Sequence, residues 1–270
     1  MRRPTDSWGT EMLKVLFMGR KPVAAQALES LLARSDVDVV GVLTDNHLPV
    51  SPTTDAAARN GVKIYEFAEA LAALKERTLA FDLGISMLYW KKLKDELLSA
   101  PSRGVINFHP APLPQYKGTA GYNLAILEGR GSWAVSAHYM DENIDTGGII
   151  KLKEFEIDRE KETAHSLERK SQSVLFELFR EVFQAALESE ESLPVSPNVG
   201  GRYVSRAEME SMKEVKSGDD IAKKIRAFWF PPYDGAYQVV DGRKYTLVDR
   251  FILESLGDPN TSNLFTEQKC

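Results

Sequence analysis

Residues 104–118 read GVINFHPAPLPQYKG, a short apolar run followed by three prolines. Val105 and Ile106 are typical of a buried strand, and the prolines at positions 110, 112 and 114 prevent that strand from continuing. Asn107 and His109 are two residues apart, so on an extended backbone their side chains leave the same face. The stretch therefore predicts a strand end that presents an amide and an imidazole to one small group.

The chemistry of this pair suits acyl transfer. Histidine exchanges a proton near neutral pH, and an asparagine amide donates hydrogen bonds to an oxygen that gains negative charge. A carboxylate that could orient the imidazole stands at Asp145, in the sequence IDTGG. A covalent cysteine mechanism is disfavoured because the one cysteine is Cys270. The alternative is that Asn107 and His109 merely cap the strand end and its turn.

The composition predicts a globular protein with one large core and room for a small additional region, because 270 residues with 43% apolar side chains can bury such a core. The formal net charge of −5 gives no overall attraction to nucleic acid. No apolar run approaches a membrane span, and residues 1–14 are too polar for a signal peptide. One cysteine permits neither an internal disulfide nor a zinc cluster. We therefore expect a cytoplasmic protein that binds no metal, nucleic acid or membrane.

Predicted strands alternate with predicted helices in the first part of the chain. This order predicts an α/β fold with a parallel, doubly wound sheet, in which sites lie beyond the carboxyl ends of the strands. Gly19, residues 86–90 and residues 107–109 should therefore share one rim. After a loose lead (1–11), the predicted strands are 13–18, 37–44, 62–65, 81–87 and 104–109, the helices are 22–32, 55–60, 68–77 and 91–99, and 45–54 is a loop.

Beyond the prolines, the pattern predicts strands at 133–140 and 148–157, a helix at 122–128 and a long amphipathic helix at 162–187. A polar passage with proline and glycine at 188–201 predicts a boundary between a catalytic domain, residues 1–195, and a small C-terminal region, residues 196–270. That region should hold a helix at 219–227 and a hairpin whose strands, 237–240 and 244–248, flank an Asp-Gly turn. A lone hairpin is marginal, so it should pack on the main domain or on a second subunit.

Two strand ends on the predicted rim carry candidate binding residues. Gly19-Arg20-Lys21 precedes a helix, so backbone N–H groups and two cations either form an anion site or are simply solvated. The other strand end, SMLYW at residues 86–90, would wall an apolar slot for a flat ring. The alternative is that Met87 and Leu88 are ordinary core residues.

The whole arrangement, NFHPAPLPQYKG followed by a spacer and IDTGG, resembles the formyltransferases that use formyl-tetrahydrofolate. The resemblance covers roughly residues 13–253 and implies a Rossmann-like, doubly wound formyltransferase fold with a small C-terminal helix and hairpin. It implies that 10-formyltetrahydrofolate is the formyl donor, that Asn107 stabilises the oxyanion, that His109 takes or relays the proton, and that Asp145 orients His109. The folate would be held by Ser86, Met87, Leu88, Tyr89 and Asp141.

The sequence indicates the residues that would bind the formyl acceptor less specifically. Tyr116, Lys117 and Gly118 match the family's aromatic, basic and glycine sequence, although Lys117 contacts either substrate or only solvent. The segment FWFPPYDGA at residues 228–236 resembles the C-terminal segment of the sugar-nucleotide N-formyltransferases, which are commonly dimers. Trp229 and Tyr233 would then stack on a base or form a homodimer seam. The implied acceptor, for which Gly19, Arg20 and Lys21 would supply the anion site, is a nucleotide-linked dideoxy amino sugar of an O-antigen, with dTDP, GDP and UDP left open.

Other interpretations are kept as alternatives. A methionyl-tRNA formyltransferase needs a basic surface, whereas residues 201–250 hold ten Lys and Arg against eight Asp and Glu. A glycinamide ribonucleotide enzyme has a Gly/Ser-rich phosphate loop where this chain has GRKP at residues 19–22. Two other functions remain as alternatives. The protein could hydrolyse the formyl donor, or it could be a noncatalytic sensor that binds folate or a nucleotide sugar. His138, inside a predicted strand, is interpreted as structural.

Overall fold

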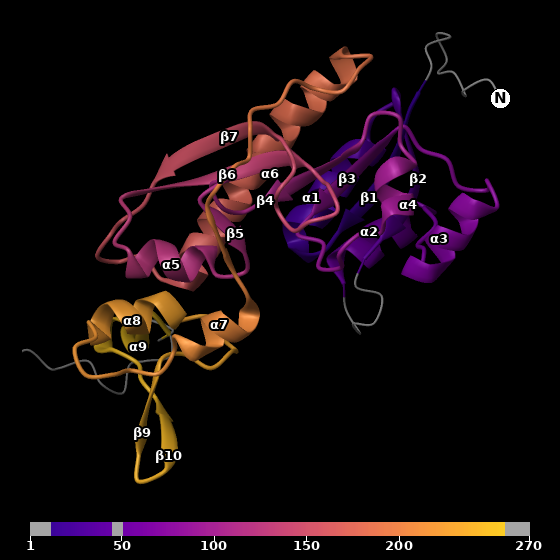
Figure 1. Ribbon diagram of the computed structural model, residues 1–270. Coiled ribbons are helices and arrows are strands. Elements are labelled where there is room, and N and C mark those ends of the chain that lie inside the picture. Colours follow the sequence, from indigo (N-terminus) through magenta and orange to yellow (C-terminus); the bar gives the residue numbers. More distant parts are fainter. Residues whose placement is uncertain (1–11, 45–50, 257–270) are drawn as a thin grey trace, which may run out of the picture.

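The computed structural model describes residues 12–44 and 51–256. The predicted loose lead, most of the predicted loop at 45–54 and the tail to Cys270 therefore lie outside the described residues. The centre of the molecule is a sheet with the strand order β2-β1-β3-β4-β6-β7 (Figure 1). Its strands are β1 (Leu13–Gly19), β2 (Val37–Leu43), β3 (Leu83–Met87), β4 (Val105–His109), β6 (Ser132–Tyr139) and β7 (Ile149–Glu156).

The first four strands are parallel and are buried on both faces. Along β1, Val15 and Phe17 point into one core cluster, whereas Leu16 and Met18 point into another, as expected for the alternation of side chains along a strand. Helices cover both faces, which confirms the predicted α/β fold. The first cluster includes residues of α1 (Lys21–Leu32), α2 (Pro52–Arg59) and α6 (Ala164–Glu188), and the second includes residues of α3 (Phe67–Lys75) and α4 (Asp95–Ser99).

Two further strands extend the predicted parallel sheet with antiparallel pairings. Strand β6 is antiparallel to β4, and β7 is antiparallel to β6. The chain between β6 and β7 spans only residues 140–148, which is shorter than the dozen or more residues that a parallel crossover needs. The return of the chain beside β6 therefore has to be antiparallel.

Some elements are shorter than predicted. The predicted strand at 62–65 is reduced to an isolated bridge between Val42 and Ile64, and the helix predicted at 91–99 begins only at Asp95. The proline-containing loop ends in a short strand, β5 (Tyr116–Gly118), which the sequence did not indicate. It pairs in parallel with β8 (Arg202–Val204), about 85 residues further along the chain. Helix α5 (Gly121–Leu127) follows β5.

The C-terminal region packs beside α5 and α6, and its hairpin projects away from the sheet (Figure 1). A third apolar cluster joins Ile126 of α5 and Ala164 of α6 to residues such as Ile225 and Phe228. The predicted helix and hairpin are present, whereas the other two helices were missed. The elements are α7 (Arg206–Ser211), α8 (Ile221–Phe228), β9 (Tyr237–Val240), β10 (Arg243–Thr246) and α9 (Arg250–Leu256).

Candidate active site

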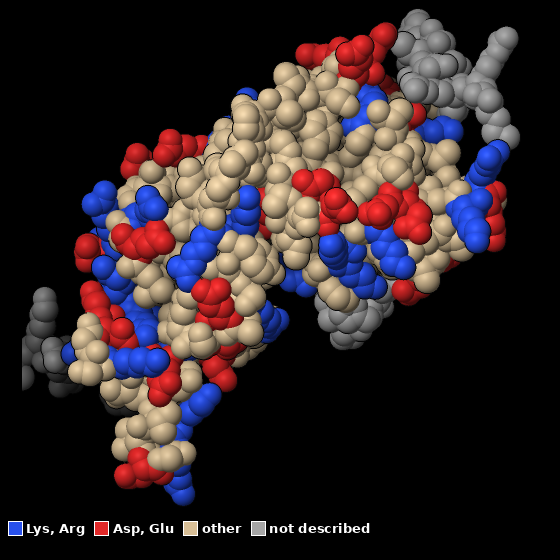
Figure 2. Space-filling view, viewed as in Figure 1, with Lys and Arg blue, Asp and Glu red and all other residues tan. Residues whose placement is uncertain are grey.

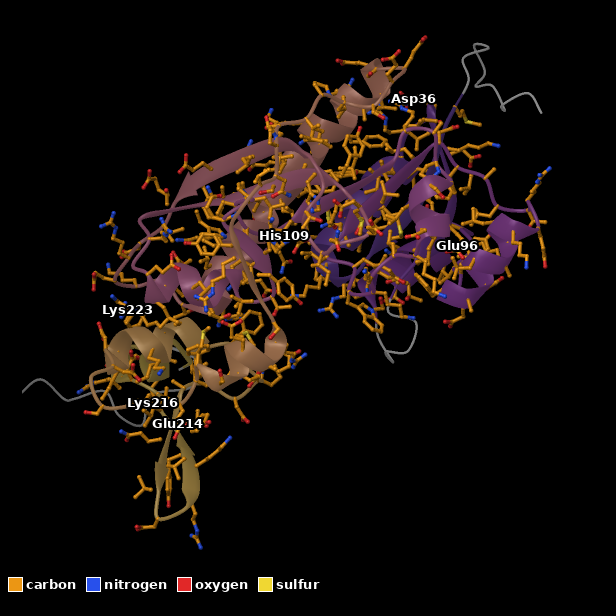
Figure 3. The ribbon with its side chains drawn as sticks, viewed as in Figure 1. Asp36, Glu96, His109, Glu214, Lys216 and Lys223 are labelled. Atoms are coloured by element: carbon orange, nitrogen blue, oxygen red, sulfur yellow. The ribbon has the colours of Figure 1, made fainter. Side chains whose placement is uncertain are left out.

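A cavity of about 510 Å³ lies at the carboxyl ends of β1, β3 and β4 and extends towards the C-terminal region. Arg20 follows β1, Leu88 follows β3 and His109 ends β4, as the rule for open α/β sheets predicts. His109 lies in the middle of the molecule, between the sheet and the C-terminal region (Figure 3). The opposite wall comes from α7 and the aromatic segment after α8.

Asn107 is oriented by two buried neighbours. Its Oδ1 accepts a hydrogen bond of 2.8 Å from the Ser86 hydroxyl, and its Nδ2 lies 3.0 Å from Nε2 of His138. The Tyr139 carbonyl, 2.7 Å from Nδ1 of His138, can only accept, so this nitrogen carries the proton and Nε2 accepts from Asn107. These contacts use one of the two hydrogens on Nδ2 of Asn107. The other can be donated to an oxygen in the cavity.

His109 is 5% exposed and is held by the loop that follows it. Its Nε2 lies 3.0 Å from the Tyr116 carbonyl, so Nε2 is the donor and Nδ1 carries the free electron pair of the neutral ring. Nδ1 faces Oδ1 of Asp145 at 3.5 Å. Burial lowers the pKa of His109 and the nearby His138 lowers it further, which together outweigh the opposing charge of Asp145. His109 is therefore a neutral imidazole at neutral pH, ready to accept a proton.

Asp145 is an anion at every ordinary pH. Burial by itself would raise its pKa, but the facing His109, the contact with His138 and a hydrogen bond from the Gly118 N–H hold the pKa at about 2. The Gly118 bond is 2.9 Å long. Gly118 has a φ of +84°, and a Cβ there would lie 2.5 Å from the Val204 carbonyl, so the position suits only glycine. Asp145 itself has a φ of +56°, an uncommon value for a residue with a side chain.

The structure brings together the three predicted catalytic residues and part of the predicted binding set. Their arrangement places a hydrogen-bond donor, a neutral base and a fixed anion around one point, which is what attack of an amine on a carbonyl group requires. The predicted binding residues that line the same cavity are Arg20, Lys21, Leu88, Tyr89, Gly118 and Tyr233.

Other predicted binding residues have side chains outside the cavity lining. The Ser86 hydroxyl binds Asn107, and Met87 is fully buried in the core. Tyr116 turns its ring to the opposite side of its loop, where burial raises its pKa to about 12 and its hydroxyl binds Glu128. The side chain of Asp141 accepts hydrogen bonds from Asn143 and Thr146 within its own exposed loop. Gly19, Lys117 and Trp229 are also absent from the lining, and the roles of these seven residues stay predictions.

Lys21 has a partner that the sequence did not suggest. Its ammonium group binds the carboxylate of Glu168 on α6, and both residues line the cavity. Its backbone has a φ of +71°, so the turn after β1 is held in an uncommon conformation. An anion bound at this turn would therefore lie beside Lys21, whose charge is already neutralised by Glu168.

The sequence missed several residues that the cavity brings together. His138 lies in the site as the partner of Asn107, although it was interpreted as structural. The opposite wall of the cavity contains Arg206 of α7, for which the sequence offered no motif, and Phe230, which lies inside the aromatic segment at residues 228–236. The one signal was the aromatic character of residues 228–233. The cavity is also lined by Trp90, Tyr122, Asn123, Ile144, Tyr203, Met209, Glu210, Lys213, Phe228 and Asp234.

Two further features bear on the class of protein. Within residues 12–44 and 51–256, no cluster of three or more His, Cys, Asp or Glu side chains is arranged to hold a metal ion. Over the same residues, none of the helices has both the length and the apolar character needed to cross a membrane.

Comparison with known proteins points to one family. The sequence profile of the family described as Formyl transferase matches residues 13–182 of this chain. Among curated proteins, the methionyl-tRNA formyltransferase of Bacillus thuringiensis is 28% identical over 249 residues, which cover 86% of this chain and 77% of the relative.

Solved structures with the same fold include N-formyltransferases. The 4-N formyltransferase from Francisella tularensis has a TM-score of 0.72 at 22% identity, covering 87% of this chain and 96% of its own. The N-formyltransferase from Helicobacter canadensis, solved with folinic acid and dTDP-3-aminofucose, has a TM-score of 0.69 at 25% identity, covering 86% of each chain.

Proposed function

Because the chain belongs to the formyl transferase family, we propose that it transfers the formyl group of 10-formyltetrahydrofolate to the amine of a nucleotide-linked dideoxy amino sugar of an O-antigen. The observation that carries this proposal is the cavity itself. Asn107, His109 and Asp145 line the cavity between two halves. One half suits a flat ring, and the other half offers cationic and aromatic side chains to a charged acceptor that carries a base.

The donor half is supported by the residues that follow β3. Leu88, Tyr89 and Trp90 line the cavity beside the catalytic residues and offer apolar and aromatic surface to a pterin ring. Leu88 has a φ of +55°, so this strand end is held in an uncommon conformation at the cavity wall. The Helicobacter canadensis relative was solved with folinic acid, which supports the same donor class here.

The proposed chemistry needs no covalent enzyme intermediate. The neutral amine of the sugar attacks the formyl carbon, and the second Nδ2 hydrogen of Asn107 binds the oxygen that becomes negative. Nδ1 of His109 takes the proton that the amine loses, and Asp145 stabilises the resulting imidazolium. Breakage of the bond between the formyl carbon and the folate nitrogen then completes the transfer, with a proton returned to that nitrogen.

The acceptor half is supported by Arg206, which lines the cavity near Phe230 and Tyr233. Lys21 and Lys213 in the same lining are paired with Glu168 and Glu210, whereas Arg206 is exposed and makes no ion pair among the described residues. A guanidinium in this setting can bind a diphosphate through two parallel hydrogen bonds. The neighbouring aromatic rings can stack on the base.

Arg206→Ala should raise KM for the nucleotide sugar about tenfold to a hundredfold and leave KM for the folate nearly unchanged. The effect follows from the loss of charge-assisted hydrogen bonds to the diphosphate. Arg202→Ala is the matched control, since Arg202 lies four residues away, pairs with Glu208 and is outside the cavity lining. Steady-state kinetics with each substrate varied in turn would measure both values. Equal KM values for Arg206→Ala and Arg202→Ala would remove Arg206 from the acceptor site.

A second candidate, formylation of methionyl-tRNA, is favoured by the curated relatives, which carry that name. Transfer RNA binding calls for a basic surface. On the face of the C-terminal region in Figure 2, Lys and Arg alternate with Asp and Glu instead of forming a basic expanse. The sugar nucleotide therefore fits this chain better than tRNA does.

Mass spectrometry tests the function directly. The purified protein would be incubated with 10-formyltetrahydrofolate and, in separate reactions, with dTDP-, GDP- and UDP-linked amino sugars or with methionyl-tRNA. We expect one nucleotide sugar to gain the mass of one formyl group. A gain on methionyl-tRNA alone would favour the second candidate. Formate release without an acceptor would indicate a hydrolase, and ligand binding without turnover would indicate a sensor.

We also propose that the enzyme is a homodimer formed through the C-terminal region. Val239, Val240 and Tyr245 of the hairpin are each about half exposed, as are Phe251 and Leu253 of α9. A two-stranded hairpin with both faces in water is marginal, so a second copy is the expected cover. Light scattering after gel filtration should give twice the 30.2 kDa of one chain, and Val239→Lys should lower that mass towards one chain. A wild-type protein that elutes as a monomer at assay concentration would contradict the dimer.

We place the enzyme in the cytoplasm, in line with a sequence that contains one cysteine. We also propose that residues 1–195 form the catalytic domain and that residues 196–270 form the acceptor-binding and dimer-forming region.

A further inference from the structure

Residues 196–204 form a strap that connects the two proposed regions and lies across the loops of the active site. At its start, Ser196 exchanges two backbone hydrogen bonds of 2.9 and 2.8 Å with Ile149 at the beginning of β7. At its end, β8 pairs with β5, and the Thr119 N–H donates to the Val204 carbonyl. The strap is therefore tied to the catalytic domain on both sides of the site.

Asn198, in the middle of the strap, holds the turn that contains Asp145. Its Nδ2 donates to the Asp145 carbonyl at 3.0 Å and to the Gly147 carbonyl at 2.8 Å. Both partners can only accept, which fixes the orientation of the amide. Its Oδ1 is buried and has no hydrogen-bond partner among the residues described. An amide that leaves its acceptor unpaired in this way serves the site through its two N–H groups.

The turn that contains Asp145 has to be stabilised by residues outside the turn. Asp145 has a φ of +56°, and a Cβ at Gly147 would lie 2.0 Å from the Tyr139 carbonyl, so the backbone passes close to β6 in an uncommon conformation. A conformation of this kind persists only where the surroundings hold it. The two hydrogen bonds from Asn198 bracket the turn on either side of Thr146.

The same strap also supports the loop that holds His109. The Arg202 N–H donates to the Gln115 carbonyl, and the backbone of Gly201 lies against the Pro114 carbonyl so closely that a Cβ would overlap it. The paired strand β5 supplies the Tyr116 carbonyl to Nε2 of His109 and the Gly118 N–H to the Asp145 carboxylate. The positions of both His109 and Asp145 thus depend on one segment, the strap.

We propose that Asn198 is a positioning residue that sets Asp145 against His109, with the strap as the frame for both. Asn198 lies outside residues 13–182, the part matched by the family profile, and touches no group expected to react. Its effect on turnover rests on the proposed function, because it acts through Asp145. The interaction between the carboxylate and Nδ1 of His109 falls with distance, so a displaced turn weakens it.

The test compares Asn198→Leu with Val199→Ala. Leucine keeps a side chain of similar size and no charge but removes both donors, whereas Val199 is the next residue of the strap and is 81% exposed. We expect Asn198→Leu to lower kcat on the order of tenfold to a hundredfold with KM for the folate little changed, because a 1 Å misplacement of a catalytic group has an effect of that size. Val199→Ala should behave as wild type.

A second readout requires no substrate. The chain has four histidines, so the ring protons of His109 can be followed by NMR titration and assigned with His109→Gln. Asn198→Leu should lower the pKa of His109 in the same direction as Asp145→Asn but by less, because the carboxylate that favours the imidazolium has moved away. Loss of packing alone would lower the melting temperature without moving this titration.

The outcomes are distinct. An unchanged His109 titration in a folded Asn198→Leu protein would overturn the proposal, whatever happens to turnover. A shifted titration with reduced kcat would support both the proposal and the function. A shifted titration in a protein that formylates no acceptor, even as wild type, would support the positioning role and reject the proposed function.

Discussion

We expect Asn107→Ala to lower kcat for formyl transfer roughly a hundredfold to a thousandfold, because it removes the side-chain amide that we propose as a donor to the developing oxyanion. The donor is already oriented in the free protein. Ser86 binds its carbonyl oxygen and His138 accepts one of its hydrogens, so the second hydrogen is directed without rearrangement. Preorganised donors of this kind act mainly on the transition state, so KM should change much less than kcat.

The same substitution has a predictable effect on stability. Ser86 and His138 are 1% and 2% exposed, and both lose a partner in Asn107→Ala, so the free energy of unfolding should fall by roughly 1–3 kcal/mol. Circular dichroism and a melting curve would show whether the variant is folded at the assay temperature. Asn60→Ala is the matched control, because Asn60 is the C-terminal cap of α2 and lies outside the cavity lining. A folded Asn107→Ala protein with the turnover of Asn60→Ala would refute the oxyanion role.

The placement of Asn107, His109 and Asp145 in one cavity could be predicted from local sequence. The apolar run before Asn107 and the prolines after His109 specify a strand that stops at the rim of a sheet, and the two-residue spacing specifies a shared face. Asp145 was predicted because it follows a second strand within the same segment. These inferences succeed because each depends on neighbours in sequence and on the rule that sites lie at strand ends.

The residues that hold this centre could not be predicted in the same way. The strap pairs β8 with β5 across about 85 positions, Asn198 reaches Asp145 across 53, and Lys21 meets Glu168 across 147. No local periodicity records such contacts, because they arise only when the chain has folded. The contact of His138 with Asn107 could not be predicted for a related reason. Within the strand pattern His138 looks like a buried side chain, and its contact with Asn107 depends on the antiparallel register of β4 and β6.

The strained backbone at the cavity could not be predicted from the sequence either. Lys21, Leu88 and Asp145 all have positive φ values, and all three line the cavity, yet none is a glycine that would have signalled a turn. A reader of the sequence would assign ordinary backbone to them. Their clustering at the cavity is an independent structural indication that this rim is the functional site.

His109→Gln should lower kcat by about a hundredfold to ten-thousandfold, because it removes the base that we propose for the proton of the amine. Glutamine can still donate to the Tyr116 carbonyl from a nitrogen near the position of Nε2, so the loop should stay in place. What is lost is Nδ1, the atom that faces Asp145. Single-turnover measurements with saturating substrates would separate this chemical step from product release.

The pH dependence gives the same prediction a second test. The folded-state pKa of His109 is lowered by burial and by His138, so in the wild type the acid limb of kcat that it causes should lie below about pH 6.5, the ordinary value for histidine. This limb should disappear in His109→Gln. The same shift determines how stability changes with pH. Below about pH 6.5, His109 binds a proton more readily in the unfolded chain than in the folded chain.

The wild type should therefore lose stability as the pH falls through that value, and His109→Gln should lose less between pH 7.5 and pH 5 in paired melting curves. The difference between the two proteins isolates His109 from the other groups that titrate in this range. A variant with the same acid limb in kcat and the same pH-dependent loss of melting temperature as the wild type would show that the proton of the amine leaves through another group.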